Sequence, residues 1–362
     1  MPTITADDLT ALARGAAVLG TGGGGDPHIG KLMARQAMAE CGTVRMVSLQ
    51  DLPDDACVLP VAMMGAPTVM VEKLPSADQI VVAVQTLARY LGVRPTHVAC
   101  IEAGGVNCTV PIIAAAQLGL SLVDGDAMGR AFPELQMVLP TLSGVDATPM
   151  AIVDEKGNRG VLDTIDNVWA ERLARTATVE MGCSTIVSLY AMTGAQMRES
   201  FVPGTLSRCV AIGRAIENAR RELRDPVQAV EVVLGGRLIA SGKVIDVSRR
   251  TTTGFARGEA TLDGVDERAG RRLVLRFQNE HLIAELDGTA VVTTPDLIVV
   301  LDRETGEPIT TEALRYGQRV SVLGAPCDDR WHAPAGIDLV GPRYFGYDID
   351  PVRVWAGRTE AA

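Results

Sequence analysis

The residues best suited to acid-base chemistry form one short segment, DGDAMGRAFPE, at positions 124–134. Asp124 and Asp126 flank a single glycine, so their carboxylates can converge on one water molecule or one hard cation. Arg130 and Glu134 lie one turn apart if the segment is helical. The spacing leaves a second interpretation open, in which the aspartates cap backbone amides in a turn and Arg130 pairs with Glu134.

A second polar segment, EAGGVN, occupies positions 102–107. Its first residue, Glu102, is a candidate acid or base. The backbone amides of Gly104 and Gly105, together with the Asn107 side chain, can form a site for a developing oxyanion. The alternative is an ordinary turn from a strand into a helix.

A run of glycines, GTGGGG at positions 20–25, offers backbone amides in place of side chains. It fits the dinucleotide-binding pattern G-x-G-x-x-G, but that fingerprint requires a strand before its first glycine. Helical spacing precedes this run, and Asp26 and Pro27 are suited to begin a second helix. We therefore expect a connection between two helices and no nicotinamide cofactor.

The amides of this run can still form an anion-binding wall of a substrate pocket. The candidate residues for that wall are Gly22, Gly23, Gly24 and Gly25. A glycine-rich helix end followed by a linker is the plainer alternative.

Histidines and cysteines show no recognisable metal-binding spacing. The histidines at 28, 97, 281 and 332 lack an H-x-x-x-H pair, and the seven cysteines lack a C-x-x-C pair. A divalent metal, if one binds, would need mainly oxygen ligands such as Asp124 and Asp126, or ligands gathered from distant segments. Whether His28 or Cys108 takes part in chemistry is left open, and packing is the commoner role for an isolated cysteine.

The elements that must position these residues alternate between strands and helices in the first half of the chain. The spacing of apolar residues predicts helices over 5–19, 26–41 and 76–90 and from about 109, with strands over 43–49, 56–65, 97–102 and 120–126. This order is typical of a mostly parallel sheet covered by helices. Ligands bind at the carboxyl ends of such strands, where MMGAP at 63–67, EAGGVN and DGDAMGRAFPE are placed.

The second half of the chain has a different pattern. We expect helices over 163–178 and 205–221 and a strand over 184–192. Short strands follow, and they include 229–236, 238–249, 254–262, 271–286, 290–302 and 319–326. Such spacing is typical of a small antiparallel barrel or sandwich. The sequence thus predicts an α/β domain over 1–165 and a β-rich domain with linking helices over 166–362.

Composition limits the classes of partner. The chain has 362 residues, 47% of them hydrophobic, and a formal net charge of -10, which suits a globular protein and disfavours nucleic acid. Neither a signal peptide nor an apolar stretch of the ~20 residues that span a bilayer is apparent. We expect a cytoplasmic protein without a membrane partner that assembles as a homo-oligomer.

Several segments, in this order, resemble one family along nearly the whole chain. They are GTGGGGDP (20–27), EAGGVN (102–107), VDGDAMGRAFPE (123–134), RFQNEHLIA (276–284), PDLIVVLD (295–302), ALRYGQRVSV (313–322) and GPRYFGYD (341–348). The sequence resembles the S-methyl thiohydantoin desulfurase domain family, which is related to the hydantoinase/oxoprolinase group. The resemblance implies an N-terminal three-layer α/β domain and a β-rich C-terminal domain.

The resemblance also implies hydrolysis of a five-membered cyclic imide or thiohydantoin. On this hypothesis Asp124 or Asp126 activates water, directly or through a divalent metal, while Glu102 or Glu134 protonates the leaving group. Arg130 is the candidate partner for a substrate carboxylate. Two alternatives stay open: a non-catalytic metabolite-binding partner of a hydantoinase or oxoprolinase, and a nucleotide-binding enzyme.

Overall fold

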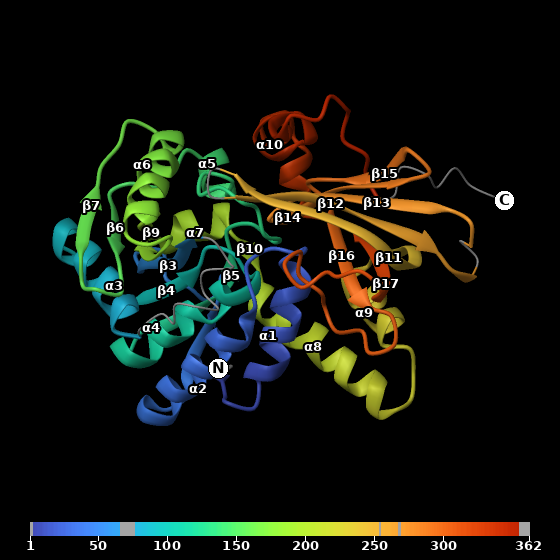
Figure 1. The fold of residues 1–362 in the computed structure, drawn as a ribbon. Coiled ribbons are helices and arrows are strands. Elements are labelled where there is room, and N and C mark those ends of the chain that lie inside the picture. The colour runs from blue at the N-terminus through green and yellow to red at the C-terminus, as the bar shows by residue number, and fades with distance from the viewer. Residues whose placement is uncertain (1–2, 66–76, 253–254, 267–268, 355–362) are drawn as a thin grey trace.

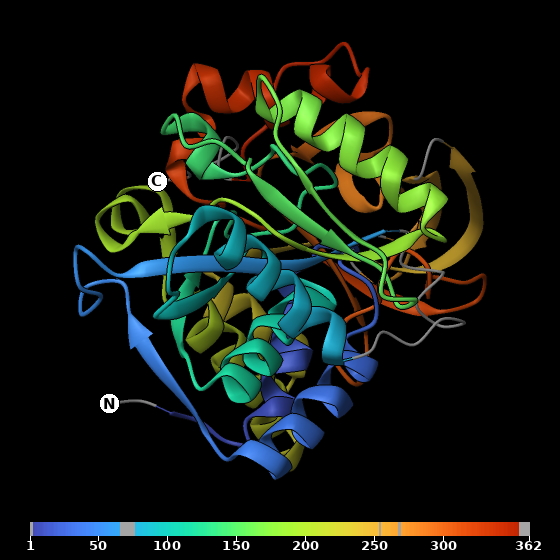
Figure 2. The same cartoon turned by 90° about the vertical axis from the view of Figure 1, so that its left-hand side faces the viewer.

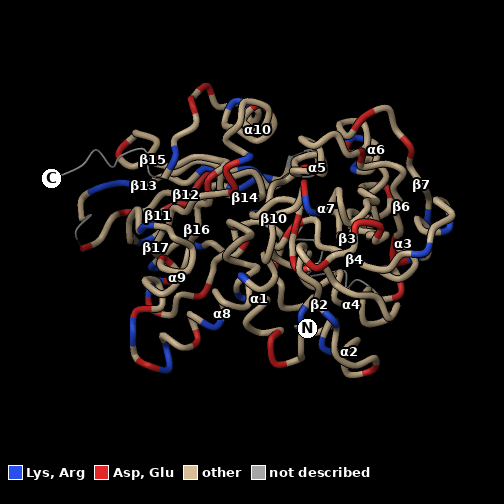
Figure 3. Tube along the Cα trace, turned by 180° about the vertical axis from the view of Figure 1, so that it is seen from behind, with Lys and Arg blue, Asp and Glu red and all other residues tan. Residues whose placement is uncertain are grey.

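The computed structural model describes residues 3–65, 77–252, 255–266 and 269–354. Figure 1 shows the chain forming two β-sheets side by side, with helices packed mainly around the first. Lys and Arg are interspersed with Asp and Glu along both parts of the trace (Figure 3). Among the described residues, no helix combines the length and the apolar character needed to cross a membrane.

Within the described residues, the first sheet has ten strands. Eight of them follow the order β1 (Thr3–Ile4), β2 (Val44–Ser48), β5 (Ser121–Asp126), β4 (His97–Cys100), β3 (Cys57–Gly65), β8 (Ser184–Ser188), β6 (Met150–Val153) and β7 (Arg159–Leu162). Two short strands extend it, because β10 (Val202–Pro203) pairs with β5 and β9 (Met192–Thr193) pairs with β3.

The expectation of a mostly parallel sheet is correct only for the centre of this sheet. Strands β2, β5, β4 and β3 pair in parallel, whereas β1 and the strands beyond β3 pair antiparallel. The short connection between β6 and β7 explains part of the difference, since a tight hairpin can join only antiparallel strands. The sheet is therefore mixed.

Helices cover both faces of this sheet, as the three-layer expectation requires (Figure 2). One face packs on α1 (Leu9–Leu19), α2 (Pro27–Cys41), α3 (Ala77–Leu91), α4 (Val110–Leu118) and α8 (Thr205–Arg221). The other face packs on α5 (Leu139–Leu142), α6 (Asn167–Glu180), α7 (Gly194–Ser200) and α10 (Pro334–Val340). Neighbouring strand residues such as Met46 and Val47 alternate between the two cores, as side chains on a strand must.

The second sheet is antiparallel and curls into a half-barrel. Its strand order is β15 (Thr289–Thr293), β14 (Glu280–Leu286), β13 (Arg272–Gln278), β12 (Phe255–Gly264), β11 (Arg237–Thr252), β17 (Arg319–Ala325) and β16 (Leu297–Asp302). The end strand β16 also contacts β14 and β15, so the sheet bends around its own apolar core. The expected β-rich C-terminal part is present, as one curled sheet and not as two stacked sheets.

Three predicted strands are wrong in detail. The strand expected over 290–302 is divided into β15 and β16, which lie at opposite ends of the second sheet. Residues 229–236 belong largely to a helix, α9 (Pro226–Leu234). Asp225 caps that helix by accepting from the backbone N–H groups of Val227 and Gln228, and Gly235 ends it in a left-handed conformation. These end signals outweigh the β-branched composition.

The predicted strand over 271–286 is in fact a hairpin. Strands β13 and β14 are joined at Asn279, whose φ is 57°. Asparagine is among the few residues other than glycine that adopt this left-handed conformation readily. The turn reverses the chain and directs the start of β14 back toward the first sheet.

The domain boundary near residue 165 stays a prediction. Elements beyond it, from α6 to β10, pack on or belong to the first sheet. The first sheet and the helices that pack on it thus include residues beyond the predicted boundary.

Helices α1 and α8 lie against each other through small residues, and this contact sets the position of the glycine run that follows α1. A Cβ atom on Gly15 would lie 1.9 Å from the carbonyl oxygen of Cys209, and one on Gly213 would lie 2.0 Å from that of Ala11. Both helices are therefore held at a distance that only glycine permits.

Replacing Gly213 with alanine tests this contact. In an ordinary helix a Gly→Ala change stabilises by about 1 kcal/mol. Here we expect destabilisation of about 1–3 kcal/mol, because the backbone of α1 must move away. Urea unfolding measures the change, with Ala211→Gly at an exposed position of α8 as the control for helix propensity. A gain in stability for Gly213→Ala would show that the helices do not pack this closely.

Candidate active site

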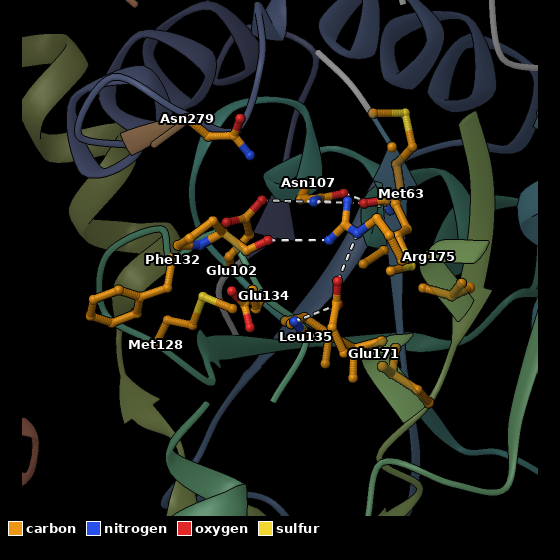
Figure 4. A pocket seen from close by; sticks show the side chains of 18 of the residues that line it. Met63, Glu102, Asn107, Met128, Phe132, Glu134, Leu135, Glu171, Arg175 and Asn279 are labelled. Atoms are coloured by element: carbon orange, nitrogen blue, oxygen red, sulfur yellow. Dashed lines mark hydrogen bonds and ion pairs between the residues drawn. The ribbon is translucent and has the colours of Figure 1, made fainter. Parts of the chain in front are cut away.

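A cavity of about 100 Å³ lies where the first sheet meets the β13–β14 turn. Its polar lining residues are Glu102, Asn107, Glu134, Glu171, Arg175, Asn279 and Glu280 (Figure 4). Its apolar lining includes Met63, Met64, Ile101, Met128, Phe132, Leu135, Val187 and Leu189. The cavity thus combines a mainly apolar wall with several carboxyl groups, a combination typical of a binding or catalytic site.

Glu102 follows β4 and is buried at the base of this cavity. Its Oε1 accepts a hydrogen bond of 2.7 Å from Nδ2 of Asn107. The Asn107 side chain is itself fixed, because it accepts from the backbone N–H of Met63 at 2.7 Å and donates to the carbonyl of Met63 at 3.1 Å. Burial raises the pKa of Glu102 to about 7, although the bond from Asn107 works in the opposite direction.

Glu280 begins β14 and brings a second buried carboxyl group to the same cavity. Its Oε2 has no hydrogen-bond partner within the part of the chain that the structure describes. Burial raises its pKa well above the ordinary value, and the negative charge of Glu102 adds to that effect, while Arg130 opposes it. Two carboxyl groups from residues far apart in the sequence therefore share one water-poor environment.

The glycine run lets the backbone approach both segments. Gly24 has a φ of 75° and lines the cavity, and its carbonyl accepts from the backbone N–H of Val106 at 2.9 Å. A Cβ on Gly105 would lie 2.0 Å from the carbonyl oxygen of Gly24. A Cβ on Gly23 would lie 2.0 Å from Oε1 of Glu280. The run thus packs between the EAGGVN segment and β14.

The other glycines proposed for substrate binding lie around the cavity and not on its surface. Gly22, Gly23, Gly25, Gly104 and Gly105 are described residues, yet none of them is among the lining residues. The expected helix-to-helix connection is confirmed, because α1 precedes the run and α2 follows it. The absence of a strand before Gly20 removes the structural basis for a dinucleotide loop.

Asp124 and Asp126 accept hydrogen bonds from different backbone amides. The carboxylate of Asp124 accepts from the backbone N–H groups of Leu206 and Ser207 and from the Ser207 hydroxyl, so it caps the start of α8. Neither aspartate lines the cavity. The spacing D-G-D identified polar residues at a strand end but could not show which amides lie nearby.

Asp126 holds two loops in place beside the cavity. Its carboxylate accepts from the backbone N–H of Ala103 at 2.9 Å and from that of Gly129. Burial raises its pKa to about 6, and these backbone bonds limit the rise. Because Ala103 follows Glu102 in the chain, Asp126 acts on the site through the position of the EAGGVN segment.

Arg130 is fully buried and does not pair with Glu134. The ion pair that the sequence spacing allowed between these two residues is therefore wrong. The guanidinium of Arg130 donates to the carbonyls of Ala131 and Asp296 and to the hydroxyl of Thr21. The segment around it is irregular and not helical. Arg130 therefore supplies a positive charge behind the cavity, which it does not line.

Glu134 lines the cavity but has its own partners. Its Oε2 accepts from the Gln136 amide at 2.6 Å and from the Tyr344 hydroxyl at 2.7 Å. Among the described lining residues the cation is Arg175, which donates to Glu171 at 2.7 Å and to the carbonyl of Pro133. Figure 4 shows Arg175 and Glu171 on the side of the cavity opposite Phe132.

Sequence reasoning missed four lining residues with polar side chains: Glu171, Arg175, Asn279 and Glu280. Asn279 and Glu280 lie in the quoted RFQNEHLIA segment, so the family motif held a signal that spacing alone lacked. Glu171 and Arg175 are four residues apart on the expected helix over 163–178. That spacing is typical of an ion pair on a helix surface and gives no sign of a cavity.

Two residues left open by the sequence lie elsewhere. His28 is exposed on α2, at a surface hollow outside the cavity. Cys108 is buried, its thiol donates to the carbonyl of Gly105, and burial raises its pKa far above the usual value. In the MMGAP segment, positions 66 and 67 lie outside the described residues.

Two family models match this chain, one in each half. A model described as "S-Me-THD-like, N-terminal domain" matches residues 7–164, and "S-Me-THD-like, C-terminal domain" matches residues 165–354. The chain belongs to the S-Me-THD-like family. This family is S-methyl thiohydantoin desulfurase-like, so the resemblance inferred from the motifs is confirmed.

A solved structure shares the fold of this S-Me-THD-like chain. It is the X-ray structure of a protein from Chromobacterium violaceum, with a TM-score of 0.77 and 23% sequence identity, covering 98% of this chain and 100% of that chain. At this identity the likeness concerns the fold alone. No curated protein matches the chain.

Replacing Glu102 with glutamine tests the electrostatic character of the site. The folded protein holds the Glu102 proton up to about pH 7, whereas the ordinary pKa is 4.5. The stability that comes from the protonated form is complete below the ordinary pKa and is lost as pH rises through the folded pKa. Glutamine stays neutral, so we expect Glu102→Gln to be more stable than wild type above that pH, by on the order of 2 kcal/mol.

Thermal unfolding at about pH 5 and about pH 8 measures this difference, which should be small at the lower pH. The exposed Glu304→Gln variant is the control and should show no such pH-dependent gain. A Glu102→Gln variant that is equally destabilised at both pH values would contradict the raised pKa of Glu102.

Proposed function

We propose that this protein is a hydrolase that removes the sulfur substituent from a five-membered cyclic thioimide of the thiohydantoin class. Glu102 acts as general base and Glu280 as general acid. The observation that carries the proposal is the meeting of two buried carboxyl groups with raised pKa values at one small cavity. Membership of a family described as S-methyl thiohydantoin desulfurase-like supports the substrate class.

The size of the cavity supports a small ring as substrate. Its volume is about 100 Å³. An engineered apolar cavity of ~150 Å³ in another protein holds benzene, so a five-membered heterocycle is of suitable size. A dinucleotide is far larger than this space, so this cavity does not suit one.

The reaction is a substitution by water at the ring carbon that bears sulfur. A water molecule loses a proton to the Glu102 carboxylate while its oxygen bonds to that carbon, giving a tetrahedral intermediate. The intermediate collapses, the carbon–sulfur bond breaks, and the departing sulfur takes a proton from the Glu280 carboxyl. The products are a ring carbonyl and a thiol, or hydrogen sulfide when the sulfur is unsubstituted, and no oxidant or reductant is needed.

The two carboxyl groups suit these different roles. A general base works best with a pKa near the operating pH, and the pKa of Glu102 is about 7. Asn107 occupies Oε1 of Glu102, which leaves Oε2 to accept the proton from water. Glu280 is the stronger candidate for a protonated carboxyl, because burial and Glu102 both favour its neutral form.

Other lining residues suit the remaining parts of such a substrate. Met63, Met64 and Met128 offer polarizable, apolar surface to a sulfur substituent. Arg175 replaces Arg130 as our candidate partner for an acidic substituent on the ring, because Arg175 lines the cavity. Asn279 directs its amide nitrogen toward the cavity in Figure 4, as a donor to a ring oxygen would.

Glutamine variants of the two carboxyl groups test the proposal. With an S-methyl thiohydantoin as substrate, we expect Glu102→Gln and Glu280→Gln each to lower kcat by about 10²-fold or more, because proton transfer is lost. Asp124→Asn should retain kcat within a few-fold, since its amide can still cap α8, and exposed Glu304→Gln should be unchanged. Thiol release and ring carbonyl formation are assayed together.

Three outcomes would count against this assignment. Loss of turnover in Asp124→Asn at full stability would return the catalytic role to the D-G-D pair. Full activity in both glutamine variants would remove the carboxyl groups from the chemistry. Binding of the substrate without turnover by the wild-type protein would favour a metabolite-binding partner.

The pH dependence follows from the same assignment. Because the base must be ionised, kcat/KM should fall as pH drops below about 7. Because the acid must be protonated, a second fall is expected at higher pH, giving a bell-shaped profile. Rates measured between about pH 5 and about pH 10 test this, and a rate independent of pH over that range would contradict it.

A further inference from the structure

A second group of chemically reactive side chains lies outside the cavity. Asp296, Cys327 and His332 each place one potential ligand atom within 4.8 Å of the other two. None of the three lines the cavity. We propose that these residues form a site for a divalent metal ion of the zinc type, a role that goes beyond the proposed desulfurase activity and does not depend on it.

The three residues come from separate segments of the C-terminal part. Asp296 immediately precedes β16, Cys327 follows β17, and His332 ends the short helix η4 (Asp329–His332). The side chains of Asp296 and His332 are 1% and 7% exposed. Ligands gathered in this way cannot be recognised from spacing in the sequence, and an ion bound to them would join three segments.

The donor set favours zinc over the hard cations. A thiolate, an imidazole nitrogen and a carboxylate oxygen are together typical ligands of zinc, whereas calcium and magnesium take oxygen ligands. Nε2 of His332 lies 2.9 Å from Oδ1 of Asp296. Zinc binds such atoms at about 2.0–2.3 Å, so the ligand atoms of a tetrahedral site lie roughly 3.3 Å or more from one another. His332 would move slightly away from Asp296 and the Cys327 sulfur would adjust to the ion, giving three protein ligands with water as the fourth.

Backbone groups already orient the carboxylate. Oδ2 of Asp296 accepts from the backbone N–H of Val354 at 2.8 Å, and Oδ1 accepts from that of Cys327 at 3.3 Å. Such outer hydrogen bonds are the usual means by which a protein holds a metal ligand in place. On binding, the Cys327 thiol releases its proton to solvent and the proton on Nε2 of His332 is replaced by the metal, with the neutral imidazole keeping its proton on Nδ1. The sulfur and the ring nitrogen bond to the metal, which loses the waters that they displace.

The site would fix one wall of the cavity without touching substrate. Trp331, next to His332, donates from Nε1 to the carbonyl of Met128 at 2.8 Å and packs edge-on against Phe132 at 4.9 Å between ring centroids. Met128 and Phe132 both line the cavity. A metal at Asp296, Cys327 and His332 would therefore hold the segment that carries Trp331 against the cavity wall.

Metal titration of the full chain tests this proposal. Protein treated with chelator and then dialysed is titrated with Zn²⁺, and bound metal is measured by mass spectrometry. We expect one zinc per chain and a higher Tm. Titration with Co²⁺ should give the thiolate-to-cobalt charge-transfer absorption of a cysteine ligand. Absence of stoichiometric zinc binding, or cobalt binding without this absorption, would overturn the proposal.

Single substitutions assign the ligands. Cys327→Ser should abolish the cobalt–thiolate absorption, and His332→Ala should lower zinc affinity by at least 10-fold. Cys57→Ser, at a half-buried cysteine of β3, is the matched control and should bind zinc as wild type does. Equal zinc binding and equal absorption in Cys327→Ser would overturn the assignment. Should Cys327→Ser fail to fold, the wild-type titrations still decide the question, and neither measurement depends on turnover.

Discussion

The backbone of Gly24 lies directly against that of Gly105, and the position of the whole site depends on this contact. A Cβ on Gly105 would meet the Gly24 carbonyl at 2.0 Å, and the N–H of Val106 donates to the same carbonyl. Gly23 allows the side chain of Glu280 to approach from the opposite sheet. The glycine run is therefore the place where the first sheet, the helix α1 and the half-barrel come together.

This junction concentrates charge in a region with little water. Glu102, Asp126, Glu280 and Arg130 are all buried, and only Arg130 is basic. Acidic groups in such surroundings are destabilising when ionised, so the pKa values of Glu102 and Asp126 rise to about 7 and about 6. Reactive carboxyl groups and reduced stability thus have the same physical cause, as is common at functional sites.

Much of the framework could be predicted because its signals are local. Helix α2 begins at Asp26 and Pro27 as expected, and the glycine run joins two helices. The prediction was wrong at α9, where the valine-rich sequence indicated a strand. The helix there begins after Asp225 and ends before Gly235. The β6–β7 hairpin was not predicted.

The site was less predictable, because it depends on contacts between distant segments. Glu102 and Asn107 were identified from one motif, whereas Glu280 comes from a strand start 178 positions after Glu102, within a hairpin that had been expected as one strand. Capping of backbone amides was one of the two roles that the sequence left open for Asp124, but the amides belong to residues 206 and 207, which spacing could not show. A cytoplasmic location and a homo-oligomer stay predictions.

The fold raises the pKa of the Glu102 carboxyl group from 4.5 to about 7, and the proposed chemistry depends on this shift. The most direct test of the shift is a pH titration of the protein labelled with ¹³C at the glutamate carboxyl carbons, followed by NMR. Glu102 is assigned from the signal that disappears in Glu102→Gln. We expect that signal to titrate with a midpoint near pH 7. A midpoint near the ordinary glutamate value of 4.5 would contradict it.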